Sequence, residues 1–194
     1  MDKAKESAHR VCPWWLGYFL ASPLRKLEYN PRTILAPYVK EGMTVLDFGS
    51  AMGFFSIPLA QMVGPAGKVI CVDMQEKMLA RLKKPAQKAG VSAQIETRLC
   101  TQDAPGLEPL AGTIDFALLF AVVHEVPARA ALFAGVAAAL KPQAKLLLAE
   151  PKGHVSAEDF ARTLSIAKEQ GFVEVAKPQI FRSYAVLLQR PPAN

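Results

Sequence analysis

Two glycines and an acidic residue lie close together early in the chain, in the stretch VLDFGSAMGFFSIPLA at residues 45–60. An apolar, β-rich run reaches Asp47, Gly49 and Gly53 follow it at the second and sixth positions, and a helical pattern begins directly afterwards. Glycine lets a backbone approach a ligand closely, and the N–H groups at the start of a helix point toward that ligand. The stretch therefore predicts a ligand-binding turn between a strand and a helix.

The spacing of these glycines distinguishes two classes of adenosine-containing ligand. The dinucleotide fingerprint G-x-G-x-x-G uses its third glycine for close packing of helix on strand, and its three positions here hold Gly49, Ala51 and Phe54. The bulky Phe54 argues against a nicotinamide dinucleotide. Asp47 can instead complement an α-ammonium group, which a methionine moiety has and a pyrophosphate lacks.

A second acidic residue, Asp73, closes the next apolar run, KVICVD. At the end of that strand an aspartate can accept hydrogen bonds from both hydroxyls of a ribose, as it does for NAD. Because both ligand classes carry a ribose, Asp73 supports an adenosine ligand without choosing between them.

Strands and helices must position these residues, and their patterns alternate from residue 43 onward. The β-rich runs are MTVLDF, KVICVD, AQIETRL, TIDFALLF, AKLLLAE, GFVEVAK and YAVLLQR, and helical patterns cover residues 54–62, 75–89, 128–140 and 157–170. This alternation predicts an α/β fold with a doubly wound, mostly parallel sheet of seven strands and helices on both faces. The last two strands have no helix between them and are predicted to run antiparallel to each other.

Four segments together resemble the class I S-adenosylmethionine-dependent methyltransferases. VLDFGSAMGFFSIPLA and GKVICVDMQEKML are similar to motif I and the acidic motif after it, and IDFALLFAVVHEVP and LKPQAKLLLAEPKG are similar to later landmarks. The resemblance covers roughly residues 43–155 and looks closest to small-molecule enzymes of the ubiquinone and menaquinone biosynthesis type. It implies a Rossmann-like sheet with an antiparallel last strand and S-adenosyl-L-methionine as cofactor. The implied reaction is methyl transfer by in-line displacement to oxygen, carbon or sulfur of a small molecule.

Two positions depart from this family, which usually has glycine where the chain has Ala51 and Ala144. If residue 51 takes a positive φ, alanine there is strained. We expect cofactor binding to survive this change.

The resemblance and the residue types together indicate a cofactor site. The turn at residues 100–103 is implied to flank the adenine, with Asp103 accepting from its amino group, and Phe120 is implied to lie under the methionine part. A surface aspartate and a core phenylalanine are the plainer alternatives for these two. The expected cofactor-binding residues are Asp47, Gly49, Ala51, Gly53, Asp73, Met74, Asp103 and Phe120.

His124 follows the fourth predicted strand, at the edge where open α/β sheets bind ligands. Its imidazole is a candidate catalytic base, needed only if the acceptor arrives protonated, or a group that orients the acceptor. Alternatively it caps the helix that begins near Pro127, and its neighbour Glu125 is a weaker candidate. His154 lies on the same edge, either in the substrate pocket or as an ordinary loop histidine.

Residues 1–40 are predicted to form an N-terminal helical cap or lid, ahead of the cofactor-binding domain at residues 41–194. Four prolines break this segment into short pieces. Trp15, Tyr18 and Tyr29 are candidates for lining the acceptor pocket, or they pack the lid onto the domain.

The composition limits the partners. The 194-residue chain has a net charge of +6, but its Lys and Arg residues are scattered, so nucleic acid is an unlikely partner and a small molecule is expected. The three cysteines lack CxxC spacing and no metal site is expected. No segment reaches the roughly 18 apolar residues of a membrane span, and a cytoplasmic protein is expected. The oligomeric state cannot be read from the sequence.

The residues after the fourth predicted strand and the cysteines argue against several other methyl acceptors. FAVVHEVP at residues 120–127 lacks the Asn/Asp-Pro-Pro-aromatic sequence of nucleobase amino methyltransferases, and no Pro-Cys nucleophile is present. Arsenite acceptors call on several thiols, whereas Cys71 is predicted to lie in the core. Three alternatives stay open. The basic pI favours an RNA or protein methyltransferase, and Ala51 favours a non-catalytic S-adenosylmethionine-binding module. The third is a nicotinamide-dependent oxidoreductase, which Phe54 disfavours.

Overall fold

The computed structural model describes residues 29–192, and residues 1–28 and 193–194 lie outside the described part. Trp15, Tyr18 and most of the predicted lid therefore lie outside it as well, and their roles stay predictions.

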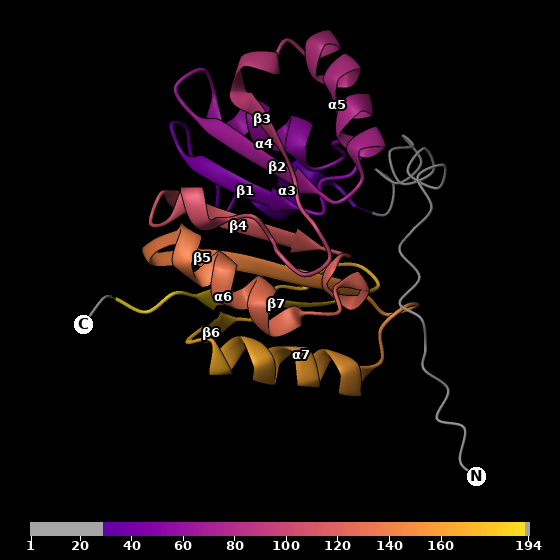
Figure 1. Cartoon of the computed structure of the whole chain (residues 1–194), viewed down its shortest axis with the longest axis vertical. Coiled ribbons are helices and arrows are strands. Elements are labelled where there is room, and N and C mark those ends of the chain that lie inside the picture. The colour runs from indigo at the N-terminus through magenta and orange to yellow at the C-terminus, as the bar shows by residue number, and fades with distance from the viewer. Residues whose placement is uncertain (1–28, 193–194) are drawn as a thin grey trace.

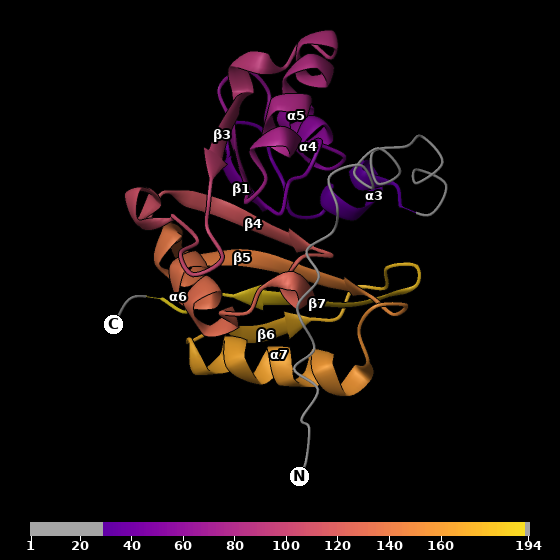
Figure 2. The same cartoon turned by 45° about the vertical axis from the view of Figure 1, so that its right-hand side comes forward.

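One sheet of seven strands organises the described chain, in the order β3-β2-β1-β4-β5-β7-β6 (Figures 1 and 2). Strands β1 to β5 pair in parallel, and β7 runs antiparallel to both β5 and β6. The predicted doubly wound, Rossmann-like sheet with an antiparallel last strand is therefore confirmed. The strands are β1 (Thr44–Phe48), β2 (Lys68–Asp73), β3 (Ile95–Leu99), β4 (Ile114–Phe120), β5 (Leu140–Pro151), β6 (Val173–Ala176) and β7 (Ser183–Gln189).

Helices connect the parallel strands, and four of them agree within two residues with the helical patterns expected from the sequence. Short 3-10 turns occur in the loops before and after β3 and β4. The helices are α3 (Pro31–Leu35), α4 (Ser56–Val63), α5 (Glu76–Lys88), α6 (Arg129–Ala139) and α7 (Ala157–Glu169), and the 3-10 turns are η2 (Ser92–Gln94), η3 (Glu108–Leu110) and η4 (Val123–Glu125).

Local chemistry determines where two of these helices begin. The side chain of Asn30 accepts hydrogen bonds from two N–H groups of the first turn of α3, where Pro31 occupies a position that needs no donor. Ser156 caps α7 by accepting from the N–H of Asp159, and the acidic first turn suits the positive end of the helix dipole.

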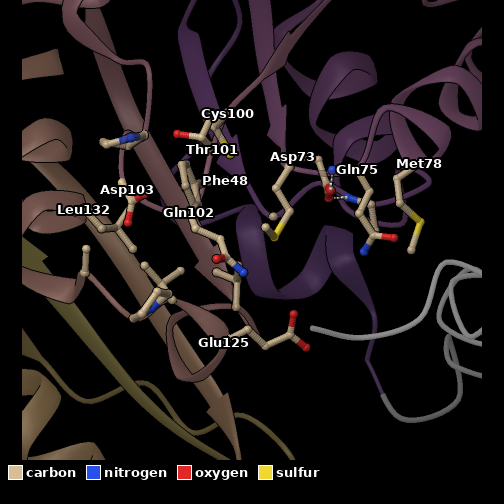
Figure 3. A pocket seen from close by; sticks show the side chains of 18 of the residues that line it. Phe48, Asp73, Gln75, Met78, Cys100, Thr101, Gln102, Asp103, Glu125 and Leu132 are labelled. Carbon is tan, nitrogen blue, oxygen red and sulfur yellow. Dashed lines mark hydrogen bonds between the residues drawn. The ribbon is translucent and has the colours of Figure 1, made fainter. Parts of the chain in front are cut away.

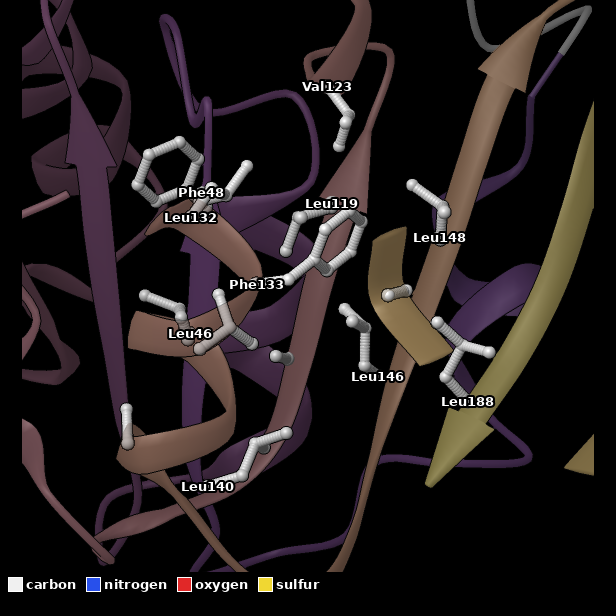
Figure 4. Packing of buried hydrophobic residues seen from close by; sticks show 14 of the residues in the cluster. Leu46, Phe48, Leu119, Val123, Leu132, Phe133, Leu140, Leu146, Leu148 and Leu188 are labelled. Carbon is white, nitrogen blue, oxygen red and sulfur yellow. The ribbon is translucent and has the colours of Figure 1, made fainter. Parts of the chain in front are cut away.

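Alternate strand residues supply two hydrophobic cores, one on each face of the sheet. The first core contains Val45 together with residues of α3, α4 and α5. The second core contains Leu46 together with residues of α6 and α7, and part of it is drawn in Figure 4. Phe133 of α6 is fully buried beside Leu146 in the second core. Cys71 is fully buried in the first core, which confirms its prediction as a core residue.

The strand order reverses at β1, which pairs with β2 on one side and β4 on the other. Open α/β sheets bind ligands in the crevice outside the carboxyl ends of the strands at such a reversal. In this chain those ends are Phe48, Asp73 and Phe120.

The described end of the predicted lid packs onto the domain. Helix α3 contacts α4, and Leu35 and Tyr29 are buried in the first core. Its closure over an acceptor stays a prediction. Within residues 29–192, no helix has both the length and the apolar character needed to cross a bilayer.

Candidate functional site

A pocket lies at the carboxyl ends of β1 to β4, at the reversal of strand order (Figure 3). Its empty volume is about 840 Å³ when the space open to solvent is counted. The lining comes from residues within 48–51, 73–78, 100–105 and 121–128, together with Leu132. The glycine turn, the end of β2 and the loop after β4 thus meet in one place.

The turn after β1 requires glycine for two separate reasons at residue 49. Gly49 has a φ of +77°, in the left-handed region that favours glycine. A Cβ at this position would lie 2.5 Å from Cγ2 and 2.7 Å from Cβ of Val122, which belongs to the loop after β4. Glycine therefore lets the two loops pack against each other at the edge of the pocket.

Ala51, the residue that departs from the resembled family, has a φ of +46°. An L-residue with a side chain pays roughly 1–2 kcal/mol for this conformation. Its N–H donates a hydrogen bond of 2.9 Å to Oδ2 of Asp73. The strain expected for alanine at this position is therefore present, and the hydrogen bond to Asp73 holds the turn in place.

Asp73 lines the pocket from the end of β2 and is 8% exposed. Its Oδ1 accepts from the N–H of Gln75 at 2.8 Å, in addition to the bond from Ala51 to Oδ2. Burial raises the pKa of Asp73, against the lowering effect of these hydrogen bonds. A carboxylate offers about four acceptor sites, and the N–H of Met74 is a third backbone donor to Asp73, so the side chain keeps acceptor capacity for a ligand.

Asp47, which the sequence predicts to face the ligand, is not among the pocket-lining residues. Its side chain is 3% exposed and Oδ2 accepts from Oγ of Ser56 at 2.6 Å. Burial raises the pKa of Asp47 to about 7, with a smaller raising effect from the charge of Asp73. Gly53 also lies outside this pocket and lines a separate depression beside Phe54.

Phe120 and Tyr29 both lie in the hydrophobic core that contains α3 and α4. The ring of Phe120 lies 4.4 Å from that of Phe55 and 5.1 Å from that of Tyr29, measured between centroids. The hydroxyl of Tyr29 is 3.3 Å from Oγ of Ser183. Neither aromatic residue lines the pocket, and the arrangement of Phe120 matches its alternative interpretation as a core residue.

The segment after β3 forms part of the pocket wall, and its contact with an adenine stays a prediction. Thr101, Gln102 and Asp103 all line the pocket, and all three are exposed (Figure 3). Met74 lines the pocket beside Asp73. Cys100 is also part of the lining, and burial together with the charge of Asp73 raises the pKa of its thiol to about 11. This cysteine is therefore a neutral thiol near neutral pH and a poor nucleophile.

His124 lies in η4, between the pocket-lining residues Val122 and Glu125. Its Nδ1 is 2.5 Å from Oε2 of Glu150, and its Nε2 is 3.9 Å from Oε1 of Glu125. The ring of His154, which is exposed, meets it edge to face at a centroid distance of 5.7 Å. Helix α6 begins after Ala128 without a side-chain cap, so His124 does not cap it.

The pKa of His124 depends on opposing effects. Burial lowers the pKa, but the hydrogen bond and charge of Glu150, with the charge of Glu125, outweigh burial and raise the pKa above the ordinary value. Arg129 opposes this rise. The site therefore favours the protonated imidazole more than water does.

Glu150, at the end of β5, is the site residue that sequence reasoning missed. It is 1% exposed, and its Oε1 accepts from the N–H groups of Val122 at 3.3 Å and Val123 at 2.7 Å. The signal was present in the run AKLLLAE, where a single acid ends an apolar strand beside the strand that leads to His124. Among residues 29–192, no group of three or more His, Cys, Asp or Glu side chains is placed to hold a metal ion.

Comparisons with known proteins show that this chain is similar to methyltransferases. Residues 39–181 match the profile of a family described as Methyltransferase domain. The chain is 28% identical over 144 residues to the arsenite methyltransferase of Aquipseudomonas alcaligenes, covering 71% of this chain and 42% of that protein. It is 29% identical over 127 residues to the ubiquinone biosynthesis O-methyltransferase of Methylocella silvestris, covering 64% and 47%.

The crystal structure of a SAM-dependent methyltransferase from Aquifex aeolicus has the same fold, with a TM-score of 0.83 at 24% identity over 93% of this chain and all of that chain. This chain spans somewhat less than half the length of the two curated relatives. The family match nevertheless covers most of the chain, including the glycine turn, Asp73 and the loop that carries His124. The chain belongs to the methyltransferase-domain family.

Proposed function

We propose that this chain is an S-adenosylmethionine-dependent methyltransferase acting on a small molecule. The observation that carries the proposal is the pairing of Asp73 with the glycine turn at the edge of the pocket. A carboxylate at this place suits a ribose diol, and the family match supports methyl transfer as the use of the bound nucleoside.

The residues present fit the cofactor on the nucleoside side. Gly49 lets the turn after β1 pack against Val122 at the edge of the pocket, and Asp73 keeps acceptor capacity at the pocket wall. Leu132 and Met78 add an apolar surface suited to a base. When bound, S-adenosylmethionine supplies a methyl group that is already activated by its sulfonium, so the protein must mainly align the acceptor and exclude water.

Asp47 supports the site indirectly. Since its carboxyl is buried and bonded to Ser56, we infer that it braces the junction between β1 and α4 and does not pair with the α-ammonium group of the ligand.

The acceptor is proposed to be organic, with oxygen favoured as the nucleophile. One relative is named for arsenite and another for O-methylation in ubiquinone biosynthesis. In the described part of the chain both cysteines are buried, Cys71 in the core and Cys100 in the pocket wall, so they do not provide a pair of accessible thiols for arsenite. These free thiols also fit a reducing compartment such as the cytoplasm.

Calorimetric titration with S-adenosylmethionine, S-adenosylhomocysteine and NAD tests the cofactor. We expect micromolar binding of the first two and none of NAD. Absence of binding by the sulfonium compound and its product, or binding of NAD, would overturn the proposal.

A methyl-labelling experiment then tests the acceptor class. The protein is incubated with tritium-labelled S-adenosylmethionine and a cell extract separated into small-molecule, RNA and protein fractions. We expect label in the small-molecule fraction. Label confined to RNA, with binding that weakens steeply as salt rises, would instead support the alternative that the net charge of +6 favours.

A further inference from the structure

We propose that Glu150 is a positioning residue that holds His124 as the Nδ1–H tautomer, so that Nε2 is the atom that takes a proton from the methyl acceptor. This inference rests on the proposed function, because it specifies what kind of acceptor the same site uses.

The donors around Glu150 determine the direction of its hydrogen bonds. The N–H groups of Val122 and Val123 can only donate, so Oε1 accepts from both. A carboxylate has no proton of its own to donate. With Glu150 as a carboxylate, the proton in the contact of 2.5 Å between Oε2 and Nδ1 of His124 belongs to the imidazole.

This assignment leaves the other ring nitrogen as the acceptor. In a neutral imidazole with a proton on Nδ1, Nε2 carries the lone pair. Nε2 lies 3.9 Å from Oε1 of Glu125, a residue that lines the pocket, and this distance is too long for a direct hydrogen bond. His124 does not itself line the pocket, and its Nε2 lies on the side of the ring nearest to Glu125, which does.

Charged and titratable groups on every neighbouring element act on this ring. Glu150 reaches it from the end of β5, Glu125 belongs to η4 itself, Arg129 opens α6, and His154 stands edge-on from the loop after β5. The two carboxylates outweigh Arg129 and burial, and the pKa of His124 is raised. A raised pKa makes the imidazole a stronger proton acceptor than a histidine in water.

A base at this place serves an acceptor whose nucleophilic atom still carries a proton, above all a hydroxyl group. As the hydroxyl oxygen attacks the methyl carbon, its proton passes to Nε2 of His124. The O–CH₃ bond forms, the S–CH₃ bond breaks, and the electron pair of the broken bond remains on sulfur. The imidazolium, balanced by Glu150, then returns its proton to water.

The variant Glu150→Gln separates positioning from support of the fold. The amide oxygen of the new side chain can still accept from the two backbone N–H groups, so the loop that lines the pocket keeps its anchor. The amide NH₂ must then donate to Nδ1 of His124, which places the ring proton on Nε2. The substitution preserves the shape of the site and reverses the tautomer.

Nuclear magnetic resonance of the ring nitrogens reads the tautomer directly. The chain has three histidines, so His124→Gln assigns the signals. We expect the Nδ1–H tautomer in the wild type, the Nε2–H tautomer in Glu150→Gln, and a fall in the pKa of His124 of about one unit or more in that variant. Glu125→Gln, the matched control, should lower the pKa less and leave the tautomer unchanged.

Binding of S-adenosylhomocysteine keeps the two proposals distinguishable. We expect Glu150→Gln to bind it within about threefold of the wild type, because the loop is retained, and to lose at least about tenfold in methyl labelling. Lack of binding by the wild type would remove the proposed function. Binding with an Nε2–H tautomer in the wild type, or unchanged labelling in Glu150→Gln, would overturn this inference alone. If Glu150→Gln fails to fold, the tautomer of His124 in the wild type tests the inference by itself: the Nδ1–H form supports it and the Nε2–H form overturns it.

Discussion

The N–H of Ala51 donates a hydrogen bond of 2.9 Å to Oδ2 of Asp73, so the residue that closes β2 fastens the turn that follows β1. Asp73 is therefore both a wall of the pocket and a support for the turn that forms the adjoining wall. Replacing it with alanine would remove both roles at once, and a gentler substitution is needed to separate them.

Asp73→Asn is expected to weaken binding of S-adenosylhomocysteine at least about tenfold while the protein remains folded. The asparagine oxygen can still accept from one backbone N–H, but the negative charge and part of the acceptor capacity for a ribose diol are lost. Calorimetry measures the binding, with Asp159→Asn as a control on α7, away from the pocket. Unchanged affinity in Asp73→Asn would mean that the ligand does not use this carboxylate.

Gly49→Ala is expected to destabilise the protein by roughly 2–4 kcal/mol and to abolish cofactor binding, because strain at positive φ and overpacking act together. Gly90→Ala is the matched control, since Gly90 has a φ of +71° but a Cβ added there would meet no atom within 4 Å. It should cost only about 1–2 kcal/mol. Urea denaturation measures both.

A second variant isolates the clash at Gly49. A Cβ at residue 49 would approach Cβ of Val122 itself. Adding Val122→Gly to Gly49→Ala should therefore restore part of the lost stability, so that the double variant is destabilised about as much as Gly90→Ala. No recovery would show that contact with Val122 is not what requires glycine at this position.

Ala51→Gly is expected to raise stability by about 0.5–1 kcal/mol, because relief of the strain at φ +46° exceeds the added flexibility of glycine in the unfolded chain. Ala134→Gly, at an exposed position inside α6, should lower stability by about 1 kcal/mol. Thermal unfolding compares the two. Destabilisation of similar size in both variants would mean that residue 51 carries no strain that glycine relieves.

Stability is expected to fall as the pH rises from about 4 to about 7, because Asp47 has a pKa raised to about 7 in the folded state. Between these values the folded protein binds more protons than the unfolded chain, and the linkage relation then gives a decrease of unfolding free energy with pH. Asp47→Asn should remove much of this decrease, and urea denaturation at several pH values measures it.

Asp159→Asn is the control of opposite sign for this pH series. Hydrogen bonds from Arg162 and Ser156 lower the pKa of the exposed Asp159, so its contribution is present at neutral pH and lost only as the pH falls below about 4. A stability profile that does not differ between wild type and Asp47→Asn would contradict the raised pKa of Asp47.

Much of this architecture could be predicted because the two signals that indicate it, the apolar strand runs and the glycine turn, are local in sequence. Continuous apolar runs such as FALLF indicate strands covered on both faces, and the glycine turn could be located because only glycine suits both a left-handed backbone and close contact. The place of Asp73 in the pocket wall could be predicted because it ends an apolar strand, whereas that of Asp103 was implied only by the family resemblance.

Two site residues show where local patterns were insufficient. Asp47 is one residue short of the end of β1, paired with Cys71 on β2 and Leu118 on β4, so its side chain stays inside the layer that contains α4. Glu150 required the pairing of β4 with β5, because its partner His124 is distant in sequence and only the sheet brings them together. The roles of Asp47 and Glu150 thus depend on side-chain direction and on contacts between strands, which local sequence patterns do not give.

The contact between Gly49 and Val122 also limits how this sequence can change over time. A side chain at residue 49 would meet residue 122 across two loops, so what residue 49 can become depends on which side chain stands at 122. Along any line of descent, we expect loss of bulk at 122 to precede gain of bulk at 49, because the reverse order passes through an intermediate in which the two side chains clash. Changes at the two positions should therefore occur in one order, and the pair should co-vary among relatives even though the two residues are 73 positions apart in the chain.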